Sequence, residues 1–148
     1  MTTRTTEQRN AELMQTLDDA WNTQDWDTFE ARHKPDVVVQ WPGKPATHGV
    51  RDHRAESEEL FRTFPDNKVH NRPYRVFFAD GDWTCSIAKF TGTFAGPMKA
   101  PDGSVIPPTG RTFEVDFFTV AKWDDGQIVE ENLMYDLVSF MQQIGLAD

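Results

Sequence analysis

The sequence predicts an α+β fold in which a curved antiparallel sheet wraps around helices from the first half of the chain. Apolar residues recur at helical spacing up to about residue 64, whereas residues 74–135 show the alternation of long strands. The turn Asp125-Gly126 lies between two alternating runs, which is a strong signal for an antiparallel hairpin. A sheet curved around helices leaves a pocket at its open end, so we expect the functional residues there.

Four helices are expected, over Glu7–Asn22, Trp26–His33, Gly49–Phe64 and Leu137–Ile144. In the first helix Leu13, Leu17 and Trp21 fall on one face. The third helix ends before Pro65 and carries His53 on its apolar face. The spacing therefore turns His53 toward the sheet.

Strands are expected over Val37–Trp41, Tyr74–Ala79, Trp83–Phe94, Arg111–Trp123 and Ile128–Tyr135, with a proline-rich loop at Ala95–Thr109. In residues 111–123 the odd positions are mostly apolar and the even ones mostly polar, so the odd set faces the helices. In residues 83–94 the small even-numbered side chains face inward. The outward face then presents Trp83, Cys85 and Ile87, and an exposed apolar sheet surface predicts a homodimer through the sheet.

Composition limits the classes of partner. The 148 residues fit a single domain spanning 1–148, and the formal net charge is −9. Without clustered Lys and Arg, neither nucleic acid nor an anionic membrane is an expected partner. The single cysteine, Cys85, excludes an intrachain disulfide framework, and Met1–Asn10 has no apolar segment typical of a signal peptide. We therefore expect a cytoplasmic protein.

An ordered set of short motifs resembles one family. The motifs are Pro65-Asp66-Asn67, Gly81-Asp82, Thr91-Gly92-Thr93, Pro107-Pro108-Thr109-Gly110-Arg111, Asp125-Gly126-Gln127-Ile128-Val129-Glu130 and Gln143-Ile144-Gly145. Together they resemble the SnoaL-like polyketide cyclases and predicted ester cyclases of the nuclear transport factor two-like superfamily. The resemblance covers about residues 10–146 and implies a cone-shaped, cystatin-like α+β barrel.

The resemblance also shows where this chain departs from the cyclase pattern. In the cyclases an Asp on the final strand serves as acid and base for an intramolecular aldol closure, and Leu133 stands at that position here. An inward His of the preceding strand aligns with Thr119, and a Thr-Gly-Thr-His motif ends in Phe94. Fold alone does not settle the reaction.

Two carboxylates are catalytic candidates, each with a plainer alternative. Glu131 lies in the final strand and, if it faces the pocket, burial would raise its pKa and suit it to act as a general base. Otherwise it is a solvated carboxylate at the rim. Asp136 directly precedes the last helix, where it would serve as an N-cap, although it also lies near the expected pocket mouth.

Histidines supply the other catalytic candidates. His53 is either a satisfied core residue or an acid/base group, and His48 belongs to a loop that closes over the pocket in relatives by resemblance. His33 is expected at the end of the second helix, interacting with the helix dipole, from where it could meet His53 or His48. His70 is expected to be exposed.

The remaining positions predict which residues line the pocket and whether a metal or cofactor is expected there. The expected substrate-binding residues are Trp41, Phe94, Phe117, Thr119, Leu133 and Tyr135. The grouping of His48, His53 and Glu56 lacks the spacing of a His-Glu-x-x-His zinc motif, and no nucleotide-binding glycine motif occurs, so no metal or cofactor is expected.

Two functional hypotheses remain, with a third by resemblance. The first is a cofactor-free cyclase, isomerase or lyase that acts on a small hydrophobic carbonyl compound through one carboxylate and one histidine. The second is a protein that binds a hydrophobic ligand without a reaction, which Leu133, Thr119 and Phe94 favour. The third is hydrolysis of an epoxide or ester. A hydrogen bond between His53 or His48 and Glu131 or Asp136 across a buried cavity would favour the first.

Overall fold

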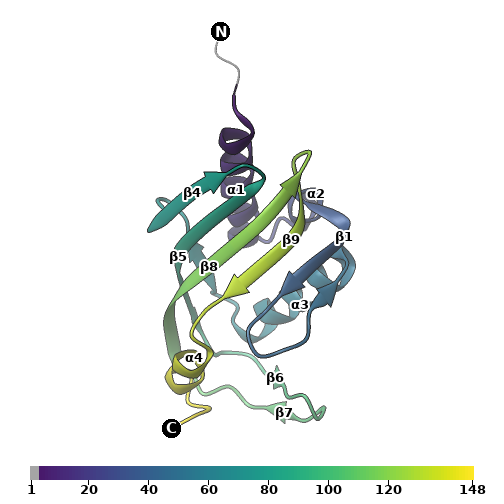
Figure 1. The fold of residues 1–148 in the computed structure, drawn as a ribbon. Coiled ribbons are helices and arrows are strands. Elements are labelled where there is room, and N and C mark those ends of the chain that lie inside the picture. Colours follow the sequence, from purple (N-terminus) through teal and green to yellow (C-terminus); the bar gives the residue numbers. More distant parts are fainter. Residues whose placement is uncertain (1–3) are drawn as a thin grey trace.

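The computed structural model describes residues 4–148 and has the predicted α+β organisation (Figure 1). The helices are α1 (Thr6–Thr23), α2 (Trp26–Ala31), α3 (Val50–Thr63) and α4 (Leu137–Gln143). The strands are β1 (His33–Gln40), β2 (Thr47–His48), β3 (Lys68–His70), β4 (Val76–Asp80), β5 (Trp83–Thr93), β6 (Met98–Lys99), β7 (Val105–Ile106), β8 (Thr112–Asp124) and β9 (Gln127–Met134).

Seven of the strands form one curved sheet. Their order is β2-β1-β9-β8-β5-β3, and β4 also pairs with β5. All pairs are antiparallel except β1 with β9, which run parallel. This parallel pair joins the first strand of the chain to the last one and thereby brings residues near 33 beside residues near 130.

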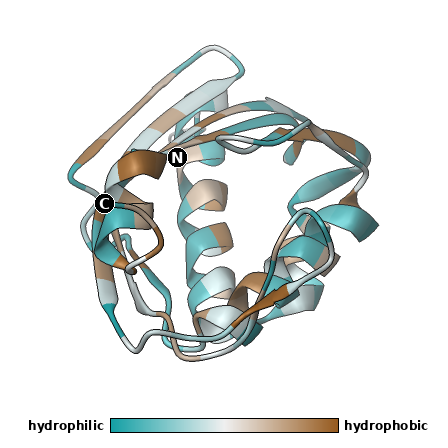
Figure 2. Ribbon diagram, turned by 90° about the horizontal axis from the view of Figure 1, so that it is seen from below, coloured by the Kyte–Doolittle hydropathy of each residue, from teal (hydrophilic) through white to brown (hydrophobic). Residues whose placement is uncertain are grey.

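The helices α1 and α3 lie on the inner side of the sheet's curve (Figures 1 and 2). The core between them and the sheet is largely aromatic: Phe64 contacts Phe94, Phe113 and Phe140 at ring-centroid distances of 5.6, 5.3 and 5.5 Å. Aromatic rings bury a large apolar area per residue, which lets a chain of this length form an extensive core.

The predicted strand faces are confirmed. On β5 the even-numbered residues 84–92 are buried, and on β8 the odd-numbered residues 113–123 are buried. On β9 a shift in the pairing with β8 falls between Lys122 and Trp123. Such a bulge changes the side-chain alternation, so Ile128 faces inward in the first part of the strand and Glu131 in the second.

Four short strands and one helix boundary differ from the sequence-based expectations. The strands β2, β3, β6 and β7 were not predicted, and β6 and β7 form a hairpin inside the expected loop Ala95–Thr109. The prediction that the second helix ends at His33 is wrong, because α2 ends at Ala31 and His33 begins β1. The cause is non-local: the Ile128 N–H on β9 donates to the carbonyl of Arg32, which draws this segment into the sheet.

Membrane insertion by a helix finds no support in residues 4–148, where no helix combines the length and apolarity needed to cross a bilayer. The expected cytoplasmic location is tested by nothing further and stays a prediction.

One glycine contact holds the end of α3 against the segment that follows β5. The Gly96 N–H donates to the Thr63 carbonyl, and a Cβ at Gly96 would lie 1.9 Å from the carbonyl oxygen of Arg62. We predict that Gly96→Ala lowers the free energy of unfolding by about 3 kcal/mol, because backbone must move to admit the methyl group. Urea unfolding measures the change. The exposed neighbour Ala95 provides the control: Ala95→Ser should leave stability unchanged, and an equally stable Gly96→Ala would contradict the prediction.

Candidate functional site

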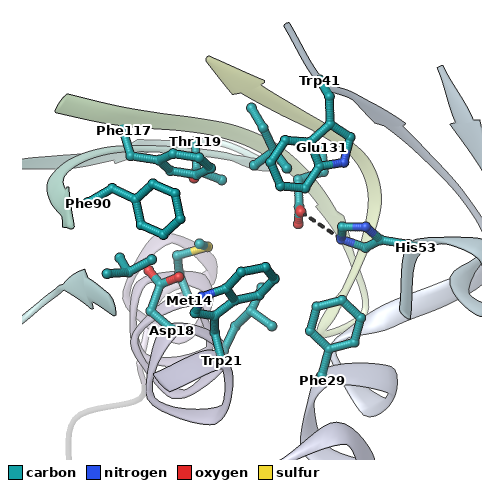
Figure 3. A pocket seen from close by; sticks show the side chains of 13 residues that line it. Met14, Asp18, Trp21, Phe29, Trp41, His53, Phe90, Phe117, Thr119 and Glu131 are labelled. Carbon is teal, nitrogen blue, oxygen red and sulfur yellow. Dashed lines mark hydrogen bonds and ion pairs between the residues drawn. The ribbon is translucent and has the colours of Figure 1, made fainter. Parts of the chain in front are cut away.

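A narrow cavity lies between α1, α3 and the concave face of the sheet (Figure 3). It has a volume of about 30 Å³, room for about two water molecules. Its lining residues are Met14, Leu17, Asp18, Trp21, Phe29, Trp41, His53, Val69, Phe90, Phe117, Thr119, Glu131 and Leu133. A second, outer pocket of about 150 Å³ is lined by Trp41, Pro42, Lys44, Glu56, Leu60 and Tyr135. Trp41 lines both, so its indole lies at the boundary between the inner cavity and the outer pocket.

Glu131 is held between two histidines. Its Oε2 lies 3.1 Å from Nε2 of His33, and its Oε1 lies 3.2 Å from Nε2 of His53. All three side chains are buried, and they come from β1, α3 and β9. The alternative prediction, in which Glu131 is a solvated carboxylate at the rim of the pocket, is therefore wrong, because its side chain is only 5% exposed.

Hydrogen-bond partners fix where the protons lie. The other ring nitrogen of His33, Nδ1, is 2.7 Å from the carbonyl oxygen of Phe29, so Nδ1–H donates to that oxygen. A carbonyl and a carboxylate are both acceptors, hence a proton also lies between Nε2 of His33 and Glu131. His33 thus contacts a carbonyl in the last turn of α2 as well as Glu131, and its predicted interaction with the dipole of that helix stays a prediction.

The groups around Glu131 and His53 shift the pKa values of both side chains. Burial alone would raise the pKa of Glu131, but the facing His33 and His53 outweigh it and hold that pKa well below its ordinary value. Burial likewise lowers the pKa of His53, but its contacts with Glu131 and then Glu56 raise it to about 9. Glu131 is thus an anion, not the neutral or weakly acidic group expected from burial alone.

Asp18 is a second buried carboxyl group, and it was not among the predicted candidates. It lies on α1, where its Oδ2 accepts a hydrogen bond of 2.5 Å from the hydroxyl of Tyr74. Burial raises its pKa to about 7; the Tyr74 hydrogen bond opposes this shift, and the charge of Glu131 adds to it. The signal was in the spacing, because Met14, Asp18 and Trp21 fall on one helical face.

Five of the six expected wall residues line a pocket. Trp41, Phe117, Thr119 and Leu133 line the inner cavity. Tyr135 lines the outer pocket and stacks on Phe117 at 5.9 Å between ring centroids. Their roles in binding stay predictions.

The remaining expected residues lie apart from the cavity. Phe94 is fully buried in the aromatic core and lines neither pocket. Asp136 is exposed and accepts a 3.0 Å hydrogen bond from the Ser139 N–H, which is the N-cap alternative. His48 and His70 are exposed, on β2 and β3. Of the expected catalytic residues, the structure therefore brings together His53 and Glu131, and it adds His33 and Asp18.

The same cluster has the composition of a metal site. One ligand atom each from His33, His53 and Glu131 can be chosen so that all lie within 4.8 Å of one another. This trio shares only His53 with the sequence grouping of His48, His53 and Glu56.

The cavity has chemically distinct sides. Figure 3 shows Asp18 on the α1 side and the His53–Glu131 pair on the opposite side, with aromatic and aliphatic side chains around them. A carboxyl group with a pKa near neutrality and a strongly held imidazole can give and take protons in a space that excludes bulk water.

Comparisons with known structures agree with this architecture. An assigned SnoaL-like polyketide cyclase from Jannaschia sp. CCS1 is 25% identical over 100% of this chain and 99% of its own, with a TM-score of 0.84. IdmH from Streptomyces antibioticus, assigned as a polyketide cyclase, is 24% identical over 92% of this chain and 98% of its own, with a TM-score of 0.76. AclR from Streptomyces galilaeus, assigned as a hydroxylase, is 19% identical over 94% of this chain and 86% of its own, also with a TM-score of 0.76.

The last two likenesses show the fold alone, and the assigned activities are of two kinds, polyketide cyclase for two of the structures and hydroxylase for the third. No curated protein matches the chain. The family itself is shown by a different comparison, in which the family model for SnoaL-like polyketide cyclase matches residues 11–144, nearly the whole chain. The chain belongs to the SnoaL-like polyketide cyclase family.

Proposed function

We propose that this chain is an enzyme that moves a proton next to the carbonyl group of a small hydrophobic compound, as a cyclase, isomerase or lyase does. The observation that carries the proposal is the placement of Asp18 across one apolar cavity from the His53–Glu131 pair. The reaction uses side chains and needs no organic cofactor.

Asp18 is the proposed base. With a pKa near 7 it is substantially ionised at neutral pH and still basic enough to accept a proton from carbon. The electron pair of the broken C–H bond moves onto the carbonyl oxygen and forms an enolate. The proton on Asp18 then returns to carbon or to a leaving group, which completes the cycle.

His53 is the proposed partner of the substrate's oxygen through its Nδ1–H, because Nε2 already faces Glu131 and Nδ1 has no hydrogen-bond partner among the described residues. A hydrogen bond from a fixed imidazole stabilises an enolate more than it stabilises the neutral ketone, and that difference lowers the barrier. Trp41, Phe117 and Leu133 would hold the apolar part of the substrate. Because the inner cavity has room for about two waters, substrate entry requires a shift of Trp41 that joins it to the outer pocket.

A second candidate function is binding without turnover. Leu133 and Thr119 line the cavity at positions where the cyclase resemblance implies an Asp and a His. A wall without those two acid/base groups favours retention of a hydrophobic ligand over aldol closure.

We also propose a homodimer through the outer face of the sheet. Phe78 and Met134 are 59% and 58% exposed, and Phe118 pairs in register with Ile87 and Met134 on neighbouring strands. We call Phe78, Cys85, Ile87, Phe118 and Met134 the outer apolar strip. A contiguous strip of this kind on a sheet is typical of an interface between subunits.

Exchange of hydrogen for deuterium tests the proposed reaction. We expect the protein to catalyse deuterium incorporation beside the carbonyl of at least one compound from a panel of 2-tetralone, cyclohexane-1,3-dione and a linear triketone in D₂O, followed by NMR. Asp18→Asn should reduce the catalysed rate by at least about 100-fold, because it removes the base.

The neighbouring Asp19 gives a matched control, since it lies on the same helix and pairs with Arg72 at the surface. Asp19→Asn should exchange at the rate of the original protein. Equal rates for both variants would contradict the role of Asp18. A panel compound that binds, seen as quenched tryptophan fluorescence, but never exchanges would favour the binding function instead.

The raised pKa of Asp18 predicts how stability depends on pH. The folded protein holds this proton up to about pH 7, whereas the unfolded chain releases it near pH 3.8. Folding therefore becomes less favourable as the pH rises through this range. Relative to Asp18→Asn, the original protein should lose about 2–3 kcal/mol of unfolding free energy between pH 5 and pH 8. Urea unfolding of both proteins at the two pH values measures this, and parallel pH profiles would show that the carboxyl group ionises normally.

The dimer is tested by charge placed within the outer apolar strip. We predict that the original protein sediments as a dimer and that Phe118→Glu sediments as a folded monomer, because a carboxylate cannot be buried there without a partner. Val105 is 61% exposed on β7, away from the strip, so Val105→Glu should leave the dimer intact. Monomeric original protein at all concentrations would refute the proposal.

A further inference from the structure

We propose that His33, His53 and Glu131 bind one divalent transition-metal cation of the Zn²⁺ or Fe²⁺ type. Two imidazoles and one carboxylate are a set of protein ligands that such cations take with positions left open for another molecule. In a tetrahedral site with metal–nitrogen bonds near 2.05 Å, neighbouring ligand atoms are about 3.3 Å apart. The observed contacts of Glu131 with His33 and His53, 3.1 and 3.2 Å, are close to that separation.

The orientation of both imidazoles supports the assignment. A histidine that binds a metal usually donates its other N–H to a carbonyl or a carboxylate, which fixes the ring and its tautomer. His33 donates Nδ1–H to the Phe29 carbonyl at 2.7 Å, whereas Nδ1 of His53 makes no hydrogen bond within residues 4–148 and lies 3.7 Å from Oε2 of Glu56. Both rings turn Nε2 toward Glu131, which is the orientation that a shared cation requires.

The cavity supplies space for a further ligand. His53 and Glu131 both line the inner cavity, where Figure 3 shows them beside Trp41 and across from Asp18. A cation between them would present its open coordination positions to that space. Its additional ligand would be water or an oxygen atom of a bound carbonyl compound.

This inference goes beyond the proposed function and can fail separately from it. Asp18 keeps its proposed role as base in either case, because it is not one of the three ligands. The binding measurements use no substrate. The exchange measurements described above do not require the metal to be known.

The test uses untagged protein that has been stripped with a chelator and then titrated with Co²⁺. We expect saturation at one Co²⁺ per chain, with intense visible d–d bands of a four- or five-coordinate ion, and displacement by one equivalent of Zn²⁺. His53→Gln and Glu131→Gln should each weaken binding at least 100-fold. His48→Gln, which changes an exposed histidine on β2, should bind as the original protein does.

Circular dichroism shows whether each variant is folded. If the variants of the buried residues do not fold, the original protein still decides: its Co²⁺ affinity should fall at least tenfold from pH 8 to pH 6, because protons compete for the same nitrogens. Weak bands of a six-coordinate aqueous ion, the absence of saturation at one equivalent, or loss of binding in His48→Gln would overturn the proposal.

Discussion

The burial of the Glu131 carboxylate is the constraint on which the rest of the site depends. An isolated anion inside a protein would cost many kcal/mol, so it must face compensating groups with good geometry. Two histidines supply that compensation, and they belong to β1 and α3. The parallel pairing of β1 with β9 brings His33 to the carboxylate, and the packing of α3 against the sheet brings His53. The fold and the cluster are therefore mutually dependent: β1 in another register would leave the anion without one partner.

This arrangement also sets the character of Asp18. The carboxylate of Glu131 is already ionised, and its charge makes a second anion in the same apolar cavity less favourable. Among the described residues Asp18 has no cationic partner and accepts a side-chain hydrogen bond from the Tyr74 hydroxyl alone, so burial keeps its pKa near neutrality. Two carboxyl groups in one cavity are thus tuned in opposite directions by their partners, which is the usual physical origin of divided acid and base roles.

Periodicity predicted most of the fold and half of the site. Alternation along β8 and helical spacing on α3 were enough to predict that Thr119 and His53 face inward, because both patterns are local. His33 was misplaced because its strand forms only by pairing with residues about 95 positions later. Asp18 was missed because a charged residue beside an apolar helix face usually lies in water, and its partner Tyr74 is 56 residues away. Local patterns cannot reveal a compensation made by distant residues.

On β9 the chain departs from the cyclase pattern in the position of its carboxylate. Leu133 and Glu131 are two residues apart on one face of the strand, and both line the inner cavity. The resemblance implies a carboxylate at the Leu133 position, so in this chain the anionic group of that face lies about 7 Å nearer the start of the strand. At that position it contacts two imidazoles, those of His33 and His53. The carboxylate on this face thus belongs to a cluster of three groups, and Asp18, from a different element, is the carboxyl group that we propose exchanges protons with a ligand.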